Sequence, residues 1–352
     1  MVTPQRNPWE TSLVMCPYPQ RERSEKAQTV TGLRGCGCYK TLPAMKRKAY
    51  SGVYSHCYQR AADSEILFYS VSEFLSFFTL ICVLAVRYDV NIIALCLMID
   101  HFHMTATAEN PSSVSQLIGM ATRSFSRESN VLCGRCGPLF RHSYGSAPKR
   151  TDKAIRTNII YVGNNPVERH LVTKAEEYRW NFLAYYNNPH PFSEPLVVRR
   201  ASWALRKAIK EVKAFHSKHR HLPYTVIRRL AGKLSSKEKQ QFVDFVISAY
   251  NIIDYEGAIR YFGSYDKMIS AMHVSTGSEY DIYEVKEGKS DEHYAKMARI
   301  LLKKTGLDDI HEVLTLSNEE RYKLYNYLQP RSGATPKQIA SFLRVKIKPT
   351  QK

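Results

Sequence analysis

The chain has no hydrophobic run long enough to cross a membrane. Its longest apolar stretch, Phe74 to Val86, stops at Arg87 and Asp89, short of the roughly 20 residues that a spanning helix needs. We therefore expect a buried amphipathic helix at this position. The N-terminus also has no positive segment followed by an apolar stretch, so no signal peptide is visible. These absences predict a protein without a membrane partner.

Cysteines that could form a disulfide framework are lacking as well. The eight cysteines are scattered through 352 residues, whereas disulfide frameworks are typical of small secreted domains. We expect reduced thiols and a cytoplasmic location. Cys133 and Cys136 have the spacing of half a zinc site, but a structural zinc site normally needs a second pair. A tight turn is the simpler interpretation of these two residues.

Acidic residues are few in relation to basic ones. The chain has 51 Lys and Arg against 32 Asp and Glu, which gives a formal net charge of +19. Such a charge attracts polyanions, of which nucleic acid is the commonest. A ribosomal or merely basic protein and a binder of anionic membranes are the alternatives. Hydrophobic residues amount to 44%, which is enough for a buried core and excludes a wholly disordered chain.

The length exceeds that of one typical domain, so we expect two domains or one domain with large additions. Residues 1–46 are rich in Pro, Arg, Thr and Gly and predict a flexible N-terminal arm. Residues 47–187 contain the sharpest strand and helix patterns. Residues 188–352 open on a proline-broken linker and then show helical periods, which predict a separate all-helical extension.

The first patterned region predicts a small α+β domain. Alternation and apolar periodicity indicate three strands and three helices: strands at 54–60, 91–98 and 101–108, and helices at 71–88, 111–130 and 151–162. Their order is typical of an antiparallel sheet with helices on one face. The helix at 151–162 is expected to end before the break at 164–166 (Asn-Asn-Pro).

Two histidines, His101 and His103, occupy alternate positions of the third predicted strand. Side chains alternate along a strand, so both rings are expected on one face and Phe102 on the other. Two imidazoles held close together can bind one divalent metal, which in phosphodiester chemistry would polarise the scissile phosphate. The spacing alone is also compatible with two ordinary buried or surface histidines. The functional interpretation is favoured by the surroundings of the motif, which are an apolar strand before it, a helix after it and a strongly basic chain.

The segment LCLMIDHFHM resembles the HUH motif of the single-tyrosine HUH transposases, most nearly the branch of REP-associated tyrosine transposases. Three further segments resemble that branch in the expected order, and together the four cover about residues 50–187. The segments are YSHCYQRAADSEILFY, CGPLFRHSYG and IIYVGNNPVERHLVTKAEEYRWNFLAY. The resemblance implies a ferredoxin-like domain that cuts and rejoins single-stranded or hairpin DNA, in a monomer or a homodimer.

The same resemblance implies a magnesium or manganese ion held by His101 and His103. It also implies a tyrosine on a nearby helix that attacks the phosphate and forms a 5′-phosphotyrosine link, which is nucleophilic catalysis by an activated hydroxyl. For the cleavage interpretation to hold, both rings must project from one side of the strand and lie beside a positively charged groove.

The expected tyrosine is missing from the predicted helix at 111–130, where we look for it. Phe125 or Ala121 stands in its place, and Glu128 is the nearest candidate for a third metal ligand. Either another tyrosine serves, with Tyr144 the first after the motif and Tyr161 the next, or the protein is a catalytically impaired DNA-binding regulator. An RNA-binding protein is a third possibility, which rests on charge alone.

Basic residues that could contact DNA cluster after the histidine motif, where aromatic side chains between them suit single strands. They are Arg123, Arg127, Arg135, Arg141, Lys149 and Arg150. Residues 317–346 resemble a helix-turn-helix, in which Lys337 and Gln338 would meet phosphate or base edges. An ordinary pair of packed helices is the alternative for this segment.

Overall fold

The computed structural model describes residues 50–62, 65–135, 137–141, 143–275, 292–307 and 309–346. The predicted arm at 1–46 and Cys136 lie outside these ranges. Four strands form one antiparallel sheet in the order β2-β3-β1-β4. The strands are β1 (Ser55–Arg60), β2 (Asn91–Leu97), β3 (His101–Thr107) and β4 (Gly145–Pro148). The expectation of an α+β fold with an antiparallel sheet is confirmed.

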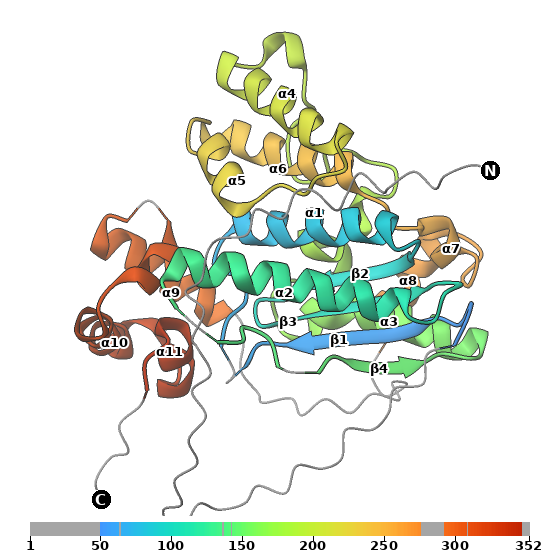
Figure 1. The fold of residues 1–352 in the computed structure, drawn as a ribbon, viewed down its shortest axis with the longest axis horizontal. Coiled ribbons are helices and arrows are strands. Elements are labelled where there is room, and N and C mark those ends of the chain that lie inside the picture. Colours follow the sequence, from blue (N-terminus) through green and yellow to red (C-terminus); the bar gives the residue numbers. More distant parts are fainter. Residues whose placement is uncertain are drawn as a thin grey trace, which may run out of the picture. The chain divides into compact units, whose positions relative to one another are not determined.

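The connections make the sheet ferredoxin-like. Helix α1 (Val71–Arg87) links β1 to β2, and α2 (Ser113–Cys133) links β3 to β4. This β-α-β-β-α-β order, with the first and third strands in the middle of the sheet, is the ferredoxin-like arrangement. In Figure 1, α1 and α2 run side by side along the sheet.

One face of the sheet carries an aromatic core. Residues directly opposite each other on paired strands project to the same side, and Cys57 of β1 lies opposite Met104 of β3. Both belong to the main hydrophobic cluster with α1 and α2. Within it the ring of Phe77 lies 5.4 Å from that of Phe102 and 5.1 Å from that of Phe125. Phe125 of α2 is therefore a core residue.

The other face of the sheet is covered by α3 (Asp152–Glu168), whose cap Thr151 accepts a hydrogen bond from the Ala154 amide. The helix was expected to end at 162, and it continues through Pro166. A proline inside a helix removes one backbone hydrogen bond, and Pro166 lies in the last turn, where that loss does not end the helix early. Asn164 and Asn165 are consequently buried helical residues.

Strand β4 has no counterpart among the strands predicted at 54–60, 91–98 and 101–108. It has four residues and pairs with β1 alone, so it forms one edge of the sheet. Short edge strands have little alternation to reveal them, and Pro148 is tolerated there because its missing N–H interrupts no inner pairing.

The rest of the described chain is helical. Its helices are α4 (Trp203–Ser217), α5 (Tyr224–Ala231), α6 (Ser236–Tyr250), α7 (Tyr255–Ile259), α8 (Tyr265–Val274), α9 (Glu292–Thr305), α10 (Asn318–Ser332) and α11 (Pro336–Leu343). No helix of the described chain combines the length and apolar character that crossing a bilayer requires.

Packing crosses the domain boundary predicted at residue 187. Helices α4, α5 and α6 share the main cluster with α1, whereas α7 and α8 pack against α3. Helices α9 to α11 form a further cluster that includes Ile66 from the loop before α1. The separate helical extension at 188–352 remains a prediction. Its first helices, α4 to α6, contribute to the core of the sheet domain.

Candidate functional site

His101 and His103 lie on the face of β3 that α3 covers. Their ring centroids are 4.8 Å apart and the rings are nearly perpendicular, at 86°. Phe102 between them points into the aromatic core on the opposite face. Both histidines are fully buried, at 0% exposure. The rings thus project from one side of the strand, as the alternation predicts.

A third histidine, His56 of β1, belongs to the same group. Its Nε2 lies 2.9 Å from Nδ1 of His103, and the two rings stack at 5.1 Å. Burial, together with the charge of Lys149, lowers the pKa of His56 to about 3. Burial and the neighbouring His101 and His56 also hold the pKa of His103 well below its ordinary value. His56 and His103 are therefore neutral near pH 7, which is the form that binds metals.

The hydrogen bonds of the two β3 rings decide which nitrogens face a ligand. His101 Nδ1 contacts the carboxylate of Asp100, so Nδ1 donates. His101 Nε2 faces the acceptor Asn165 Oδ1 and would have to keep its lone pair to bind a cation. Burial alone would raise the pKa of Asp100, but His101 and Arg60 hold it below its ordinary value. Between His103 and His56 either ring can carry the shared proton, and His103 must be the donor when its Nε2 binds a cation.

Helix α3 brings three polar side chains to this face at positions i, i+3 and i+7. Thr105 Oγ1 donates to Asn158 Oδ1 at 2.9 Å, and Asn165 Oδ1 lies 3.3 Å from His101 Nε2. Between them, Tyr161 meets His103 edge-on, with ring centroids 5.3 Å apart. Residues at this spacing share one helix face. A tyrosine thus lies directly against the histidine pair.

The centre is closed. Tyr161 and Asn165 are each 4% exposed, so α3 excludes solvent from the two imidazoles. The positively charged groove that the cleavage interpretation requires does not open onto the histidines. Across the described ranges, no group of three or more His, Cys, Asp or Glu residues could hold a metal ion. A cation site here would consist of the two histidines plus neutral or external ligands.

Glu128 and Tyr144, the sequence candidates for metal ligand and nucleophile, are not brought to the histidines. Glu128 lies on α2, where its carboxylate accepts hydrogen bonds from Ser76 Oγ at 3.3 Å and from the Tyr224 amide at 2.7 Å. Tyr144 packs against the main cluster on that same side of the sheet. The sheet separates both from the centre, because helix α2 covers its aromatic face. We therefore withdraw these two assignments.

The candidate DNA contacts divide by exposure. Arg123, Arg127, Arg141, Arg150 and Lys337 are exposed. The remaining three are engaged or buried. Arg135 forms an ion pair with Glu65 at 2.8 Å, Lys149 is 8% exposed, and Gln338 is 2% exposed. The side chain of Gln338 accepts a hydrogen bond from the Thr335 amide as part of a capping box at the start of α11. Gln338 is therefore the third residue of this helix, its side chain completes the capping box of Thr335, and its buried position does not suit contact with a DNA groove.

The histidines were found from sequence, whereas His56, Tyr161 and Asn165 were not assigned roles. Tyr161 was considered only as a second alternative tyrosine. The available signal was the row Asn158, Tyr161, Asn165, which places polar groups along one side of an otherwise apolar helix. Because the helix was predicted to end at 162, Asn165 was not recognised as part of that row.

No protein-family model and no curated protein matches the chain. A solved structure described as a REP-associated tyrosine transposase bound to a REP hairpin is similar over 40% of this chain and 81% of that chain. Sequence identity in this comparison is 15% and the TM-score is 0.35. A likeness this weak carries no argument about the activity of the present chain.

Proposed function

We propose that this chain is a transposase-like DNA-binding protein in which His101, His103 and Tyr161 form a reaction centre that cuts and rejoins single-stranded or hairpin DNA. The observation that carries the proposal is the edge-on contact of Tyr161 with His103 at 5.3 Å. This contact would bring a hydroxyl nucleophile close to a two-histidine cation site on one face of a ferredoxin-like sheet. The net charge of +19 supports a nucleic-acid partner.

The proposed cofactor is a divalent cation, magnesium or manganese, for which the two histidines supply only two nitrogen ligands and neutral or external oxygens would have to complete the set. His101 and His103 would hold it through their Nε2 atoms, with Asp100 and His56 orienting the two rings. When bound, the ion would polarise a phosphate oxygen and offset the charge that develops there. Asn165 lies beside His101 Nε2 and could supply a neutral oxygen.

Tyr161 would act as the nucleophile. Its Oη forms a bond to phosphorus while the bond from phosphorus to the 3′ oxygen breaks, and the tyrosine proton ends on the leaving oxygen. The product is a 5′-phosphotyrosine link, and attack by a free 3′ hydroxyl reverses the step and rejoins the strand. Because the rings are buried, the closed structure does not meet the condition that a groove lie beside the histidines. Cleavage therefore requires that α3 separate from β3, so that a phosphate can reach the rings.

A DNA-binding regulator that does not cleave is the second candidate. The complete burial of both imidazoles favours it, since no phosphate could approach while α3 stays in place. Binding to DNA would then rest on exposed cations such as Arg123, Arg127 and Lys337. The homodimer implied by the family resemblance remains a prediction under either candidate.

The test is a covalent-adduct assay with labelled hairpin DNA and manganese, analysed on a denaturing gel. We expect an adduct with the unmodified protein, loss of the adduct in Tyr161→Phe, and retention in Tyr144→Phe. Both substitutions remove only a hydroxyl, so the second controls for the first. An adduct that persists in Tyr161→Phe excludes the proposed nucleophile. Hairpin binding without any adduct supports the regulator.

A further inference from the structure

Helix α4 has two contrasting faces. Its cap Ser202 accepts a hydrogen bond from the Leu205 amide at 3.1 Å, and its apolar face packs into the main cluster against α5 and α6. The opposite face carries Trp203, Arg206, Lys207, Lys210 and Lys213, all exposed. These five residues, here called the α4 stripe, follow the spacing i, i+3, i+4, i+7 and i+10, which keeps them on one side of the helix.

The charges of the α4 stripe are not neutralised. Within the described residues, Arg206, Lys210 and Lys213 form no ion pair, and the acidic side chain of the helix, Glu211, is paired with Arg229. An amphipathic surface helix of a globular protein usually carries both signs of charge on its solvent face. A row of one sign makes a local positive field that attracts a polyanion.

An exposed aromatic residue belongs to the same row. Trp203 is 66% exposed, and Lys207 Nζ lies over its ring at 5.0 Å. Leaving a tryptophan in water is unfavourable, because its large apolar surface gains from burial. A π-face flanked by cations is the combination that single-stranded nucleic acids use, with bases stacking on the ring and phosphates meeting the charges.

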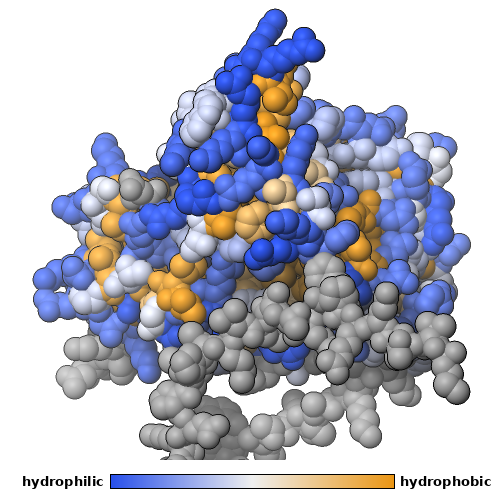
Figure 2. All heavy atoms as spheres, turned by 45° about the horizontal axis from the view of Figure 1, so that its top comes forward, coloured by the Kyte–Doolittle hydropathy of each residue, from blue (hydrophilic) through white to orange (hydrophobic). Residues whose placement is uncertain are grey.

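The α4 stripe is remote from the histidines. Helix α4 packs on α5 and α6, these pack on α1, and α1 lies on the aromatic face of the sheet, opposite the face that α3 covers. Figure 1 shows α4 on the far side of α6 from α1. In Figure 2, with this end turned forward, hydrophilic side chains lie on it beside a hydrophobic strip. A nucleotide at His101 therefore cannot also touch Lys210.

We propose that the α4 stripe binds the backbone of single-stranded DNA outside the segment that reaches the histidine centre, with Trp203 stacking on one base. The inference rests on the DNA binding proposed above and assigns it a second surface. From Trp203 to Lys213 the helix rises about 15 Å, a length along which several consecutive phosphates of a single strand can contact the stripe.

The test measures binding of a fluorescent hairpin that carries a long single-stranded extension, across a range of salt concentrations. The variant Arg206→Gln/Lys207→Gln/Lys210→Gln/Lys213→Gln removes four charges and leaves the buried face intact. Each phosphate contact contributes about 0.7 to the slope of log K against log salt. We therefore expect the slope to fall by roughly 3, with about 600-fold weaker binding at 0.1 M salt and little difference near 1 M.

The matched control removes four exposed cations from α9, as Lys296→Gln/Arg299→Gln/Lys303→Gln/Lys304→Gln. Equal losses in the two variants would show diffuse attraction and overturn the proposal. Trp203→Ala separates stacking from charge, because it should weaken binding by 5-fold or more without changing the slope.

Three outcomes locate a failure. If the unmodified protein does not bind the probe at all, the proposed function fails. If it binds and the α4 variant matches it in slope and affinity, only the α4 surface is refuted. If the α4 variant binds DNA normally but no longer sediments with phosphatidylserine vesicles, the stripe is a membrane-facing surface and the nucleic-acid assignment is wrong.

Discussion

The two imidazoles of β3 differ in the neighbour that fixes each ring. His101 donates to the carboxylate of Asp100, an ionised acceptor, whereas His103 shares a proton with neutral His56 at 2.9 Å. His56 Nδ1 has no hydrogen-bond partner among the described residues. His56 can therefore orient His103 through the contact between His56 Nε2 and His103 Nδ1. His56 is a positioning residue, because it acts through another ring.

Substitution of His56 should weaken the binding of manganese. Losing a partner that orients a metal-binding histidine typically costs 10- to 100-fold in affinity, so we expect a loss of that order in His56→Ala, measured by titration calorimetry or electron paramagnetic resonance. His273→Ala, which removes an exposed histidine paired with Glu176, should leave affinity unchanged. Equal affinities in the unmodified protein and His56→Ala would refute the orienting role.

Glu73 and His311 form a second buried titratable pair, with Oε1 and Nε2 3.2 Å apart. Burial raises the pKa of Glu73 to about 8 and lowers the pKa of His311 to about 4. Both groups are therefore neutral near pH 7, and their contact is a hydrogen bond between uncharged partners. Cys133 Sγ also approaches His311 Nε2, at 3.3 Å. The pair joins the start of α1 to the segment before α10.

Stability should fall between pH 6.5 and 8 because of Glu73. Its pKa is higher in the folded chain, so folding retains a proton that the unfolded chain releases, and stability is lost as pH rises. Below pH 6.5 His311 acts with the opposite sign, since its folded pKa is lowered. Over the 1.5 pH units from 6.5 to 8, the free energy of unfolding falls by about 2 kcal/mol. Urea unfolding at pH 6.5 and 8 measures it.

Glu73→Gln should abolish that pH dependence. Glutamine at this position keeps the capping box of α1, because its oxygen can accept from the Ser70 amide as the carboxylate does. Glu319→Gln, an exposed substitution on α10, should retain the loss of stability. If Glu73→Gln remains as pH-sensitive as the unmodified protein, the loss arises elsewhere.

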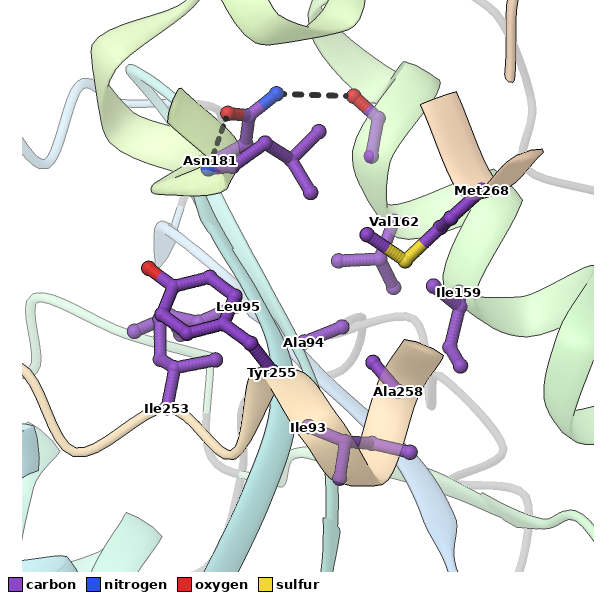
Figure 3. Close-up of a pocket in the computed structure, with 12 residues that line it drawn as sticks. Ile93, Ala94, Leu95, Ile159, Val162, Asn181, Ile253, Tyr255, Ala258 and Met268 are labelled. Atoms are coloured by element: carbon purple, nitrogen blue, oxygen red, sulfur yellow. Dashed lines mark hydrogen bonds between the residues drawn. The ribbon is translucent and has the colours of Figure 1, made fainter. Parts of the chain in front are cut away.

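At the scale of elements, α3 contacts the sheet unevenly. Its polar row meets β3, whereas its apolar side borders a small cavity shared with β2, α7 and α8. Figure 3 shows Ile93 and Ala94 from the sheet opposite Ile159 and Val162 from α3, with Met268 and Ala258 closing the space. The amide of Asn181 donates to the Gly163 carbonyl at 3.2 Å above it. Incomplete packing lowers the free energy needed to displace a helix.

Filling this cavity should hold α3 in place. Ala258→Val adds two methyl groups at a buried position of α7, and cavity filling typically raises stability by about 0.5–2 kcal/mol. We expect a higher Tm together with slower formation of the covalent adduct. Ala214→Val on the exposed face of α4 should produce neither change. A higher Tm with an unaltered adduct rate would mean that cleavage does not require α3 to move.

The elements that sequence patterns located are those with long runs of one period. Helix α1 and strands β2 and β3 were placed within two residues of their observed ends. Sequence periodicity could not show which face of the sheet each helix covers. It shows which side of a helix is buried, but not which element packs against that side. The search for a nucleophile went to α2 because the family resemblance implied the helix after the histidine strand, whereas the helix that covers the histidines is α3 with Tyr161. Because an Asn-Pro pair is typical of a turn, the predicted helix ended six residues before the observed end of α3.

At the scale of the whole molecule, α1 holds two halves of the chain together. Phe78 of α1 stacks on Phe182 at 4.3 Å, and Thr79 Oγ1 accepts a hydrogen bond from the Leu222 amide at 3.1 Å. Phe242 and Val246 of α6 belong to the same cluster. Residues on both sides of position 187 therefore complete one core, which no sequence boundary revealed.

Truncation should expose this dependence. A chain of residues 47–187 lacks α4 to α6 and leaves the apolar side of α1 in water, so we expect aggregation or loss of cooperative unfolding. A chain of residues 47–275 keeps the main cluster and the cluster around α3, and it should unfold in one transition by circular dichroism. Cooperative unfolding of the shorter chain would support the predicted boundary at 187.

Strand β3 is enclosed on both sides, with phenylalanine and methionine facing one layer and histidine and threonine facing the other. A slip of a single residue against β1 would exchange these sets and force three polar side chains among aromatic rings without partners. Misaligned pairings are thereby penalised during folding. The His-Phe-His-Met-Thr pattern consequently specifies the alignment of the sheet, and this contribution does not depend on whether the histidines bind a cation.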